Sequence, residues 1–123
     1  MNTDLALDNA KRGWTQGDII AATEQQHSGP GFFKALAEVC LTAFGGAFDY
    51  SPGQYMFRMG DLTIGDVLDF FADHRRTPVI EWANNFGPEA YIAIDDFTIA
   101  AEFEKEFDIP PLSPLEWQRL TEI

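Results

Sequence analysis

Helix starts constrain the fold of this chain more than any other feature of its sequence. Two stretches, TQGDII at 15–20 and TIGDVL at 63–68, place a threonine three residues before an aspartate. Such a threonine hydroxyl can accept a hydrogen bond from the backbone amide three residues on, and the aspartate suits the positive end of the helix. Ser113, Pro114 and Glu116 form a related start, a capping box with proline at the first helical position. We interpret the two threonine stretches as one local way to start a helix, with an ancient duplication as the alternative. Neither is a binding motif.

Apolar spacing predicts how far the helices extend. Residues at i, i+3, i+4 and i+7 lie on one face of a helix. That spacing occurs in two segments: Ile64, Val67, Leu68 and Phe71 after Thr63, and Val79, Trp82, Ala83 and Phe86 after Thr77. The segment 32–44 is apolar nearly all round, apart from a stripe of Lys34, Glu38 and Thr42, and should be central. We expect helices after Asn2, over about 15–26 and 32–44, from 63, from 77 to about 86, over about 96–107 and from 113.

Strand character is confined to two short segments. Residues 54–59 alternate, with Tyr55 and Phe57 on one face and Met56 and Arg58 on the other, and residues 90–94 are a short apolar run. The sequence therefore predicts a mainly α fold, with α+β as the alternative. It would be a single globular domain, 1–123, of five to seven helices with at most a small two-stranded sheet from about 54–59 and 90–94. A chain of 123 residues can bury a core of that size.

Charge is the strongest compositional outlier. Twenty acids face eight bases, and the formal net charge is −12. A surface this negative repels nucleic acid and anionic membranes and attracts basic partners. We therefore expect no direct binding to nucleic acid, because proteins that bind nucleic acid present a basic patch on their surface. A basic protein or nucleoprotein complex is the expected partner.

The acids gather in two places. One is the polar face of the helix after Thr63, and the other is the segment around 95–108, where six acids face only Lys105. Glu102 and Glu106 should stack one turn apart, about 6 Å, a distance similar to the spacing of phosphates along one strand of a duplex. A solvated helix face is the ordinary alternative. The candidate partner-binding residues are Asp66, Asp69, Asp73, Asp95, Asp96, Glu102, Glu104, Glu106 and Asp108.

No catalytic or metal constellation emerges from the sequence. Cys40, the single thiol, has the spacing of a core residue, and His27 and His74 lie near predicted helix ends. Phosphate-binding loops and the usual nucleophile motifs are missing. We expect a non-enzymatic protein with no catalytic residues, no metal and no cofactor.

The compartment follows from the same composition. A single cysteine cannot form an internal disulfide, which favours a reducing environment. No stretch approaches the roughly 20 apolar residues that span a bilayer. We expect a cytoplasmic protein that does not bind membranes.

Two functional hypotheses follow. The first is an acidic inhibitor that mimics nucleic acid and neutralises a basic nucleic-acid-acting partner by charge and shape. Its functional analogues are anti-CRISPR, antirestriction and nuclease-immunity proteins, and Tyr50, Tyr55 or Trp117 would serve as anchors. The second is a structural or assembly protein of a phage or mobile element that acts through homo-oligomers.

Overall fold

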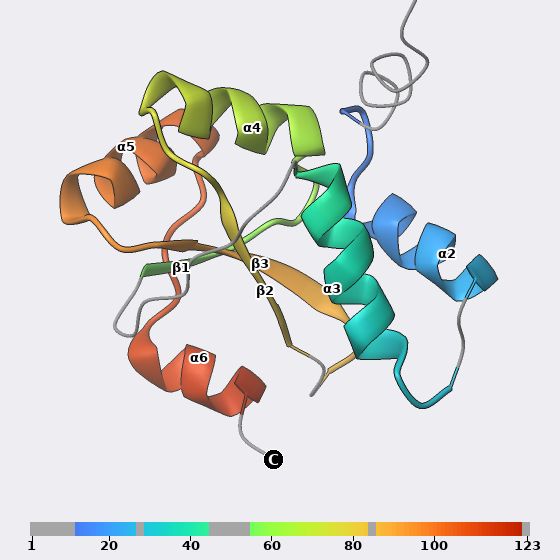
Figure 1. The fold of residues 1–123 in the computed structure, drawn as a ribbon. Helices are drawn as coiled ribbons and strands as arrows, with labels where there is room; N and C mark the ends of the chain where they lie inside the picture. Colours follow the sequence, from blue (N-terminus) through green and yellow to red (C-terminus); the bar gives the residue numbers. More distant parts are fainter. Residues whose placement is uncertain (1–11, 27–28, 45–54, 84–85, 122–123) are drawn as a thin grey trace, which may run out of the picture. The chain divides into compact units, whose positions relative to one another are not determined.

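The computed structural model describes residues 12–26, 29–44, 55–83 and 86–121 (Figure 1). Within these residues the chain forms five helices and three strands: α2 (Gln16–Gln26), α3 (Phe32–Ala43), β1 (Tyr55–Arg58), α4 (Ile64–Asp73), β2 (Val79–Ala83), β3 (Glu89–Ile94), α5 (Phe97–Phe107) and α6 (Pro114–Thr121). The fold is therefore α+β with a three-stranded sheet, and the prediction of a mainly α chain with at most two strands was wrong. The expected helix after Asn2 lies outside the described residues.

The error lies in the segment after Thr77. It was expected to be a helix and forms strand β2, which pairs antiparallel with β3 from Val79 opposite Ala93 to Ala83 opposite Glu89. Val, Ile and Trp favour strands, and β3 supplies a ladder of hydrogen-bonding partners that local spacing cannot reveal. The residue before a proline is biased toward extended backbone, so the sequence Thr77-Pro78 suits a strand entry as well as a helix start.

The sheet is antiparallel, with the strand order β1-β3-β2. β1 pairs with β3 from Tyr55 opposite Ile94 to Arg58 opposite Tyr91, which confirms the predicted pairing of the two short segments. β3 is the central strand, and its residues from Ala90 to Ile94 are almost fully buried. A strand buried on both faces reads as a continuous apolar run, and this explains why 90–94 showed no alternation.

Both faces of the sheet are covered. On one face, the ring of Phe57 lies 4.7 Å from that of Phe103 on α5. On the other, Met56 and Tyr91 join a buried cluster with Leu120 of α6. Successive strand residues point to opposite faces, so the burial of both Met56 and Phe57 requires packing on each face of the sheet. Figure 1 shows α5 and α6 on the two sides of β1 and β3.

The chain forms two compact units. The sheet with α5 and α6 belongs to one, Phe48–Met59 with Pro78–Ile123. The other, Met1–Ala47 with Gly60–Thr77, contains α2, α3 and α4. In that unit the start of α4 holds the chain that precedes α2: the Ile64 amide donates to the Trp14 carbonyl and the Gly65 amide to the Arg12 carbonyl. A Cβ atom on Gly65 would lie 2.9 Å from that Arg12 oxygen, so the close approach requires glycine.

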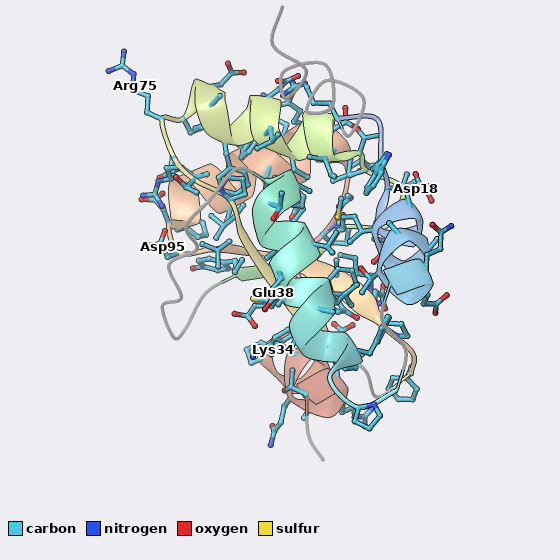
Figure 2. All side chains as sticks on the ribbon, turned by 45° about the vertical axis from the view of Figure 1, so that its right-hand side comes forward. Asp18, Lys34, Glu38, Arg75 and Asp95 are labelled. Carbon is cyan, nitrogen blue, oxygen red and sulfur yellow. The ribbon has the colours of Figure 1, made fainter. Side chains whose placement is uncertain are left out.

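Helix α3 carries the predicted polar stripe. Cys40 and Leu36 are buried, while Lys34, Glu38 and Thr42 are exposed. Figure 2 shows Lys34 and Glu38 leaving the same side of α3. The interpretation of Cys40 as a core residue is confirmed, since its exposed fraction is 2%.

The two similar stretches, 15–20 and 63–68, differ in how they cap their helices. Thr63 and Asp66 form a reciprocal capping box, as do Ser113 and Glu116. At Thr15 only half of that arrangement is present: the Thr15 amide donates to the Asp18 carboxylate, and the hydroxyl bonds the same carboxylate instead of a backbone amide. Both stretches therefore precede a helix, as predicted, but only Thr63 forms the complete capping box.

Candidate functional site

The predicted acidic residues fall on both units. Asp66, Asp69 and Asp73 belong to α4, and the other six belong to α5 and its two ends. All nine are exposed except Asp96, which is half-buried.

On α4, two of the three aspartates stabilise their own unit. Asp66 accepts from the Thr63 amide in the capping box, and Asp69 forms an ion pair with Arg12. The three share one face of the helix, as predicted, because three and four residues complete about one turn. Since Asp66 and Asp69 have structural tasks, this group supports a binding role less than the sequence indicated.

On α5, the acids do not form one row. Glu102 and Glu106 share one flank of the helix, as predicted. Glu104 leaves the opposite flank, roughly 160° away at 100° per residue, and the exposed Lys105 lies between the two flanks. Asp96 caps the helix by accepting from the Ile99 amide at 3.0 Å, and Asp108 ends it in a left-handed conformation.

An exposed aromatic pair lies at the start of α5. The rings of Tyr55 and Phe97 are 6.0 Å apart in an edge-to-face arrangement, and the two residues are 37% and 70% exposed. Asp95 directly follows Ile94, the cross-strand partner of Tyr55. Glu104 is seven residues after Phe97 and therefore shares its side of α5, about 10 Å along the axis. We call Tyr55, Asp95, Phe97 and Glu104 the aromatic–acidic surface.

The sequence-predicted anchors have different outcomes. Tyr55 is exposed and belongs to this surface. Trp117 is half-buried, and its ring packs 5.1 Å from that of Tyr91 in the core. Tyr50 lies outside the described residues. Phe97 was missed, because a large apolar residue in the first turn of an amphipathic helix is normally expected inside.

A second feature that sequence reasoning missed is a pocket of about 330 Å³ in the unit that contains the sheet. It is lined by Arg58, Phe86, Glu89, Glu116, Arg119 and Leu120. One nitrogen of Arg58 lies 3.1 and 3.2 Å from the two carboxylate oxygens of Glu89. Glu116 is engaged in the cap of α6. Two arginines and two glutamates balance in charge, and the pocket lining contains no nucleophile with an adjacent base.

Tyr91 completes the network beside this pocket. Its hydroxyl donates to Glu89 at 2.8 Å, and the Arg58 guanidinium lies over its ring, 5.7 Å from the centroid. Burial, followed by the hydrogen bond to Glu89, raises the pKa of Tyr91 to about 12. A phenol held protonated in this way cannot serve as a base at neutral pH. The network therefore fits a structural role.

Metal-binding groups are not assembled in the part of the chain that the structure describes: no three His, Cys, Asp or Glu side chains lie close enough together to hold an ion. His74 packs instead on Phe70, with ring centroids 4.4 Å apart, and its Nδ1 lies 2.9 Å from the Phe70 carbonyl oxygen. His27 lies outside the described residues.

Comparisons of the chain with protein-family models, with curated proteins and with solved structures give no match. Among the helices of the described ranges, none is long and apolar enough to cross a membrane.

Proposed function

We propose that this chain is a small acidic binding protein that neutralises a basic, nucleic-acid-acting partner. The observation that carries the proposal is the aromatic–acidic surface, where an exposed pair of rings occurs with the exposed acids Asp95 and Glu104 of the same segment, in a chain of net charge −12. Aromatic residues that remain exposed beside charged groups are typical anchors of protein interfaces. In this proposal the chain covers the surface through which the partner binds nucleic acid.

The mechanism has two parts. The excess negative charge steers a basic partner toward the chain and speeds association, an effect that weakens as salt screens it. Phe97 and Tyr55 then supply apolar area that the partner removes from water, which lowers the dissociation rate. Glu102 and Glu106, on the other flank of α5, contribute to attraction at longer range and not to the aromatic contact.

The class of protein follows from this mechanism by analogy. Its functional analogues would be those anti-CRISPR, antirestriction and nuclease-immunity proteins that block a basic nucleic-acid-binding surface. We place the protein in the cytoplasm within this proposal, because its one cysteine is buried and fits a reducing compartment.

The first experiment is a tagged pull-down from host lysate, eluted in salt steps and identified by mass spectrometry. Release of a basic nuclease or nucleic-acid-binding complex at moderate salt supports the proposal and names the partner. Recovery of the protein itself, or of a neutral assembly that persists at high salt, instead supports an assembly protein of a phage or mobile element.

The second experiment measures association and dissociation rates with the captured partner. Replacing Glu102, Glu104 and Glu106 by glutamine should slow association more than it alters stability. The matched control replaces three exposed acids of the other unit, Glu24→Gln, Glu38→Gln and Asp61→Asn, and changes the net charge equally. Equal association rates for the wild type and the first variant would contradict the electrostatic mechanism.

The aromatic contact is tested separately. Phe97→Ala should weaken binding by at least about ten-fold, mainly through faster dissociation, as for a central aromatic anchor. Phe86→Ala is the control, because Phe86 is also exposed, at 82%, but lies on the pocket and not at α5. Equal losses of affinity in the two variants would contradict a specific contact between the partner and Phe97.

A further inference from the structure

The outer edge of β2 is open among the residues that the structure describes. The Met59 amide donates to the Ala90 carbonyl, so in this antiparallel register the backbone groups of Ala90, Ile92 and Ile94 point toward β1. Those of Glu89, Tyr91 and Ala93 therefore point toward β2. On β2 their partners are Val79, Glu81 and Ala83, which leaves the N–H and C=O groups of Ile80 and Trp82 pointing away from the sheet.

The opposite edge of the sheet is covered at one point. The groups of Met56 point outward from β1 by the same alternation, and the Met56 carbonyl accepts from the Leu112 amide at 2.8 Å. No comparable hydrogen bond joins the backbone of Ile80 or Trp82 to another described residue. Protein chains normally pair, cover or charge a strand edge, because a row of free backbone groups is a template for another strand.

A half-buried carboxylate stands in the middle of this edge. Glu81 lies between Ile80 and Trp82, faces Tyr91 across the sheet and makes no hydrogen bond or ion pair with the described residues. Burial removes water from a carboxylate, which costs free energy unless a cation or a donor replaces it. A cation beside Glu81 would remove that cost.

We propose that the open edge of β2 accepts an extended segment of a partner protein, with a lysine or arginine opposite Glu81 and apolar residues on either side. In an antiparallel addition, the groups of Ile80 and Trp82 would form the new hydrogen bonds. Glu81 would then occupy a pair without hydrogen bonds, in which the two side chains lie closest. The apolar neighbours would extend the sheet face formed by Ile80 and Trp82. Main-chain hydrogen bonds would give affinity and the side chains specificity.

A second copy of the chain is the poorer occupant. Two β2 strands that pair antiparallel through Ile80 and Trp82 have three registers. These place Glu81 opposite Val79, opposite Ala83 or opposite the same glutamate of the other copy. None of them brings a cation to Glu81, and the last opposes like charges, which destabilises the pair. Charge complementarity therefore favours a basic segment from another protein.

This inference does not depend on the aromatic–acidic surface. It concerns a different element of the same unit and would hold for a partner that does not act on nucleic acid. The two proposals therefore fail separately: variants at Phe97 or at Glu102 should leave binding at the β2 edge unchanged.

Hydrogen exchange of backbone amides tests the open edge without any partner. The amides of Glu81 and Ala83 should be protected by their bonds to β3, while those of Ile80 and Trp82 should exchange much faster. Slow exchange of all four amides in dilute protein would overturn the proposal, because it would show the edge to be covered. Protection of Ile80 and Trp82 that disappears on dilution would identify a second copy as the occupant and would also overturn it.

The occupant is tested with the capped peptide Thr-Val-Lys-Val-Thr and a matched peptide carrying glutamate in place of lysine. At millimolar concentration the lysine peptide should slow exchange at Ile80 and Trp82. It should bind more tightly than the glutamate peptide, and Glu81→Gln should weaken it by about two- to five-fold. Glu81→Lys should reverse the preference, whereas the control Glu24→Lys, with the same charge change on α2, should not. No slowing by the lysine peptide, or a preference unaffected at Glu81, would overturn the proposal.

A backbone variant completes the test. Ile80→Pro removes an N–H that points away from β3, so it should retain the β2–β3 ladder and abolish peptide binding. Ile80→Val retains the N–H and should bind like the wild type. If Ile80→Pro does not fold, the charge reversal at Glu81 decides the question by itself.

Discussion

The hydroxyl of Tyr91 donates a 2.8 Å hydrogen bond to the carboxylate of Glu89, two residues earlier on the central strand. Residues two apart on a strand share one face, and Arg58 reaches the same carboxylate from β1. The three side chains come from two strands, and the Arg58–Glu89 ion pair spans 31 positions of sequence. The network therefore joins β1 to β3 on the side of the sheet that α6 covers.

Loss of the Tyr91 hydroxyl should destabilise the fold. Tyr91→Phe keeps the buried ring but removes a hydrogen bond to a charged group, so the free energy of unfolding should fall by about 1–2 kcal/mol. Urea unfolding at pH 7 measures this. Tyr55→Phe is the control, because that tyrosine is exposed, and it should stay within about 0.5 kcal/mol of wild type. Equal effects of the two variants would argue against a stabilising role for the network.

The same network predicts how stability changes in alkali. Burial and the bond to Glu89 raise the pKa of Tyr91 to about 12 in the folded chain, against an ordinary value of 10.0. The contribution of the protonated Tyr91 hydroxyl to the free energy of unfolding is therefore complete below pH 10. It is lost as the pH rises toward 12, because the tyrosine of the unfolded chain releases its proton at a lower pH. An absorbance titration should show one of the three tyrosines ionising late. Tyr91→Phe should remove that late phase and flatten the loss of stability.

A third prediction separates the two similar stretches. Thr63→Ala should cost about 1 kcal/mol of stability, because the hydroxyl accepts from the Asp66 amide at 3.1 Å. Thr15→Ala should cost less, because the Thr15 hydroxyl bonds the Asp18 carboxylate and not a backbone amide. Thermal or urea unfolding of the two variants checks the order. A larger loss at Thr15 would show that the caps do not differ in this way.

Much of the helical part could be predicted because it depends on local chemistry. Caps at Thr63, Asp96 and Ser113 act within one turn, so the residues alone identify them. Strand β2 depends on a partner instead. Its apolar residues fit a helical face and two strand faces equally, and the pairing with β3 decides between them. Single-sequence spacing does not contain that information.

The candidate site divides in the same way. The exposure of most acids on α4 and α5 and the capping roles of Asp66 and Asp96 were predictable from local sequence, but the contacts with distant residues were not. Asp69 pairs with Arg12, 57 residues earlier, and Phe97 meets Tyr55 from another element. Such contacts depend on strand register and on the path of the chain, which no local pattern encodes.

The last prediction concerns Glu81. Burial raises its pKa above the ordinary value of 4.5. A raised pKa in the folded chain means that folding favours the protonated carboxyl. The contribution of protonated Glu81 to the free energy of unfolding is therefore complete below pH 4.5, and it is lost as the pH rises through the pKa of the folded chain. At pH 7 the charged carboxylate is therefore unfavourable, and Glu81→Gln should stabilise the chain. The gain should stay below about 0.5 kcal/mol, because the group is only half-buried and solvent screens its charge. It should vanish below pH 4.5. A carboxyl NMR titration measures the pKa of Glu81 directly. A Glu81 pKa below the ordinary value of 4.5 would show that a cation already lies beside the carboxylate and would remove the reason to expect one from a partner.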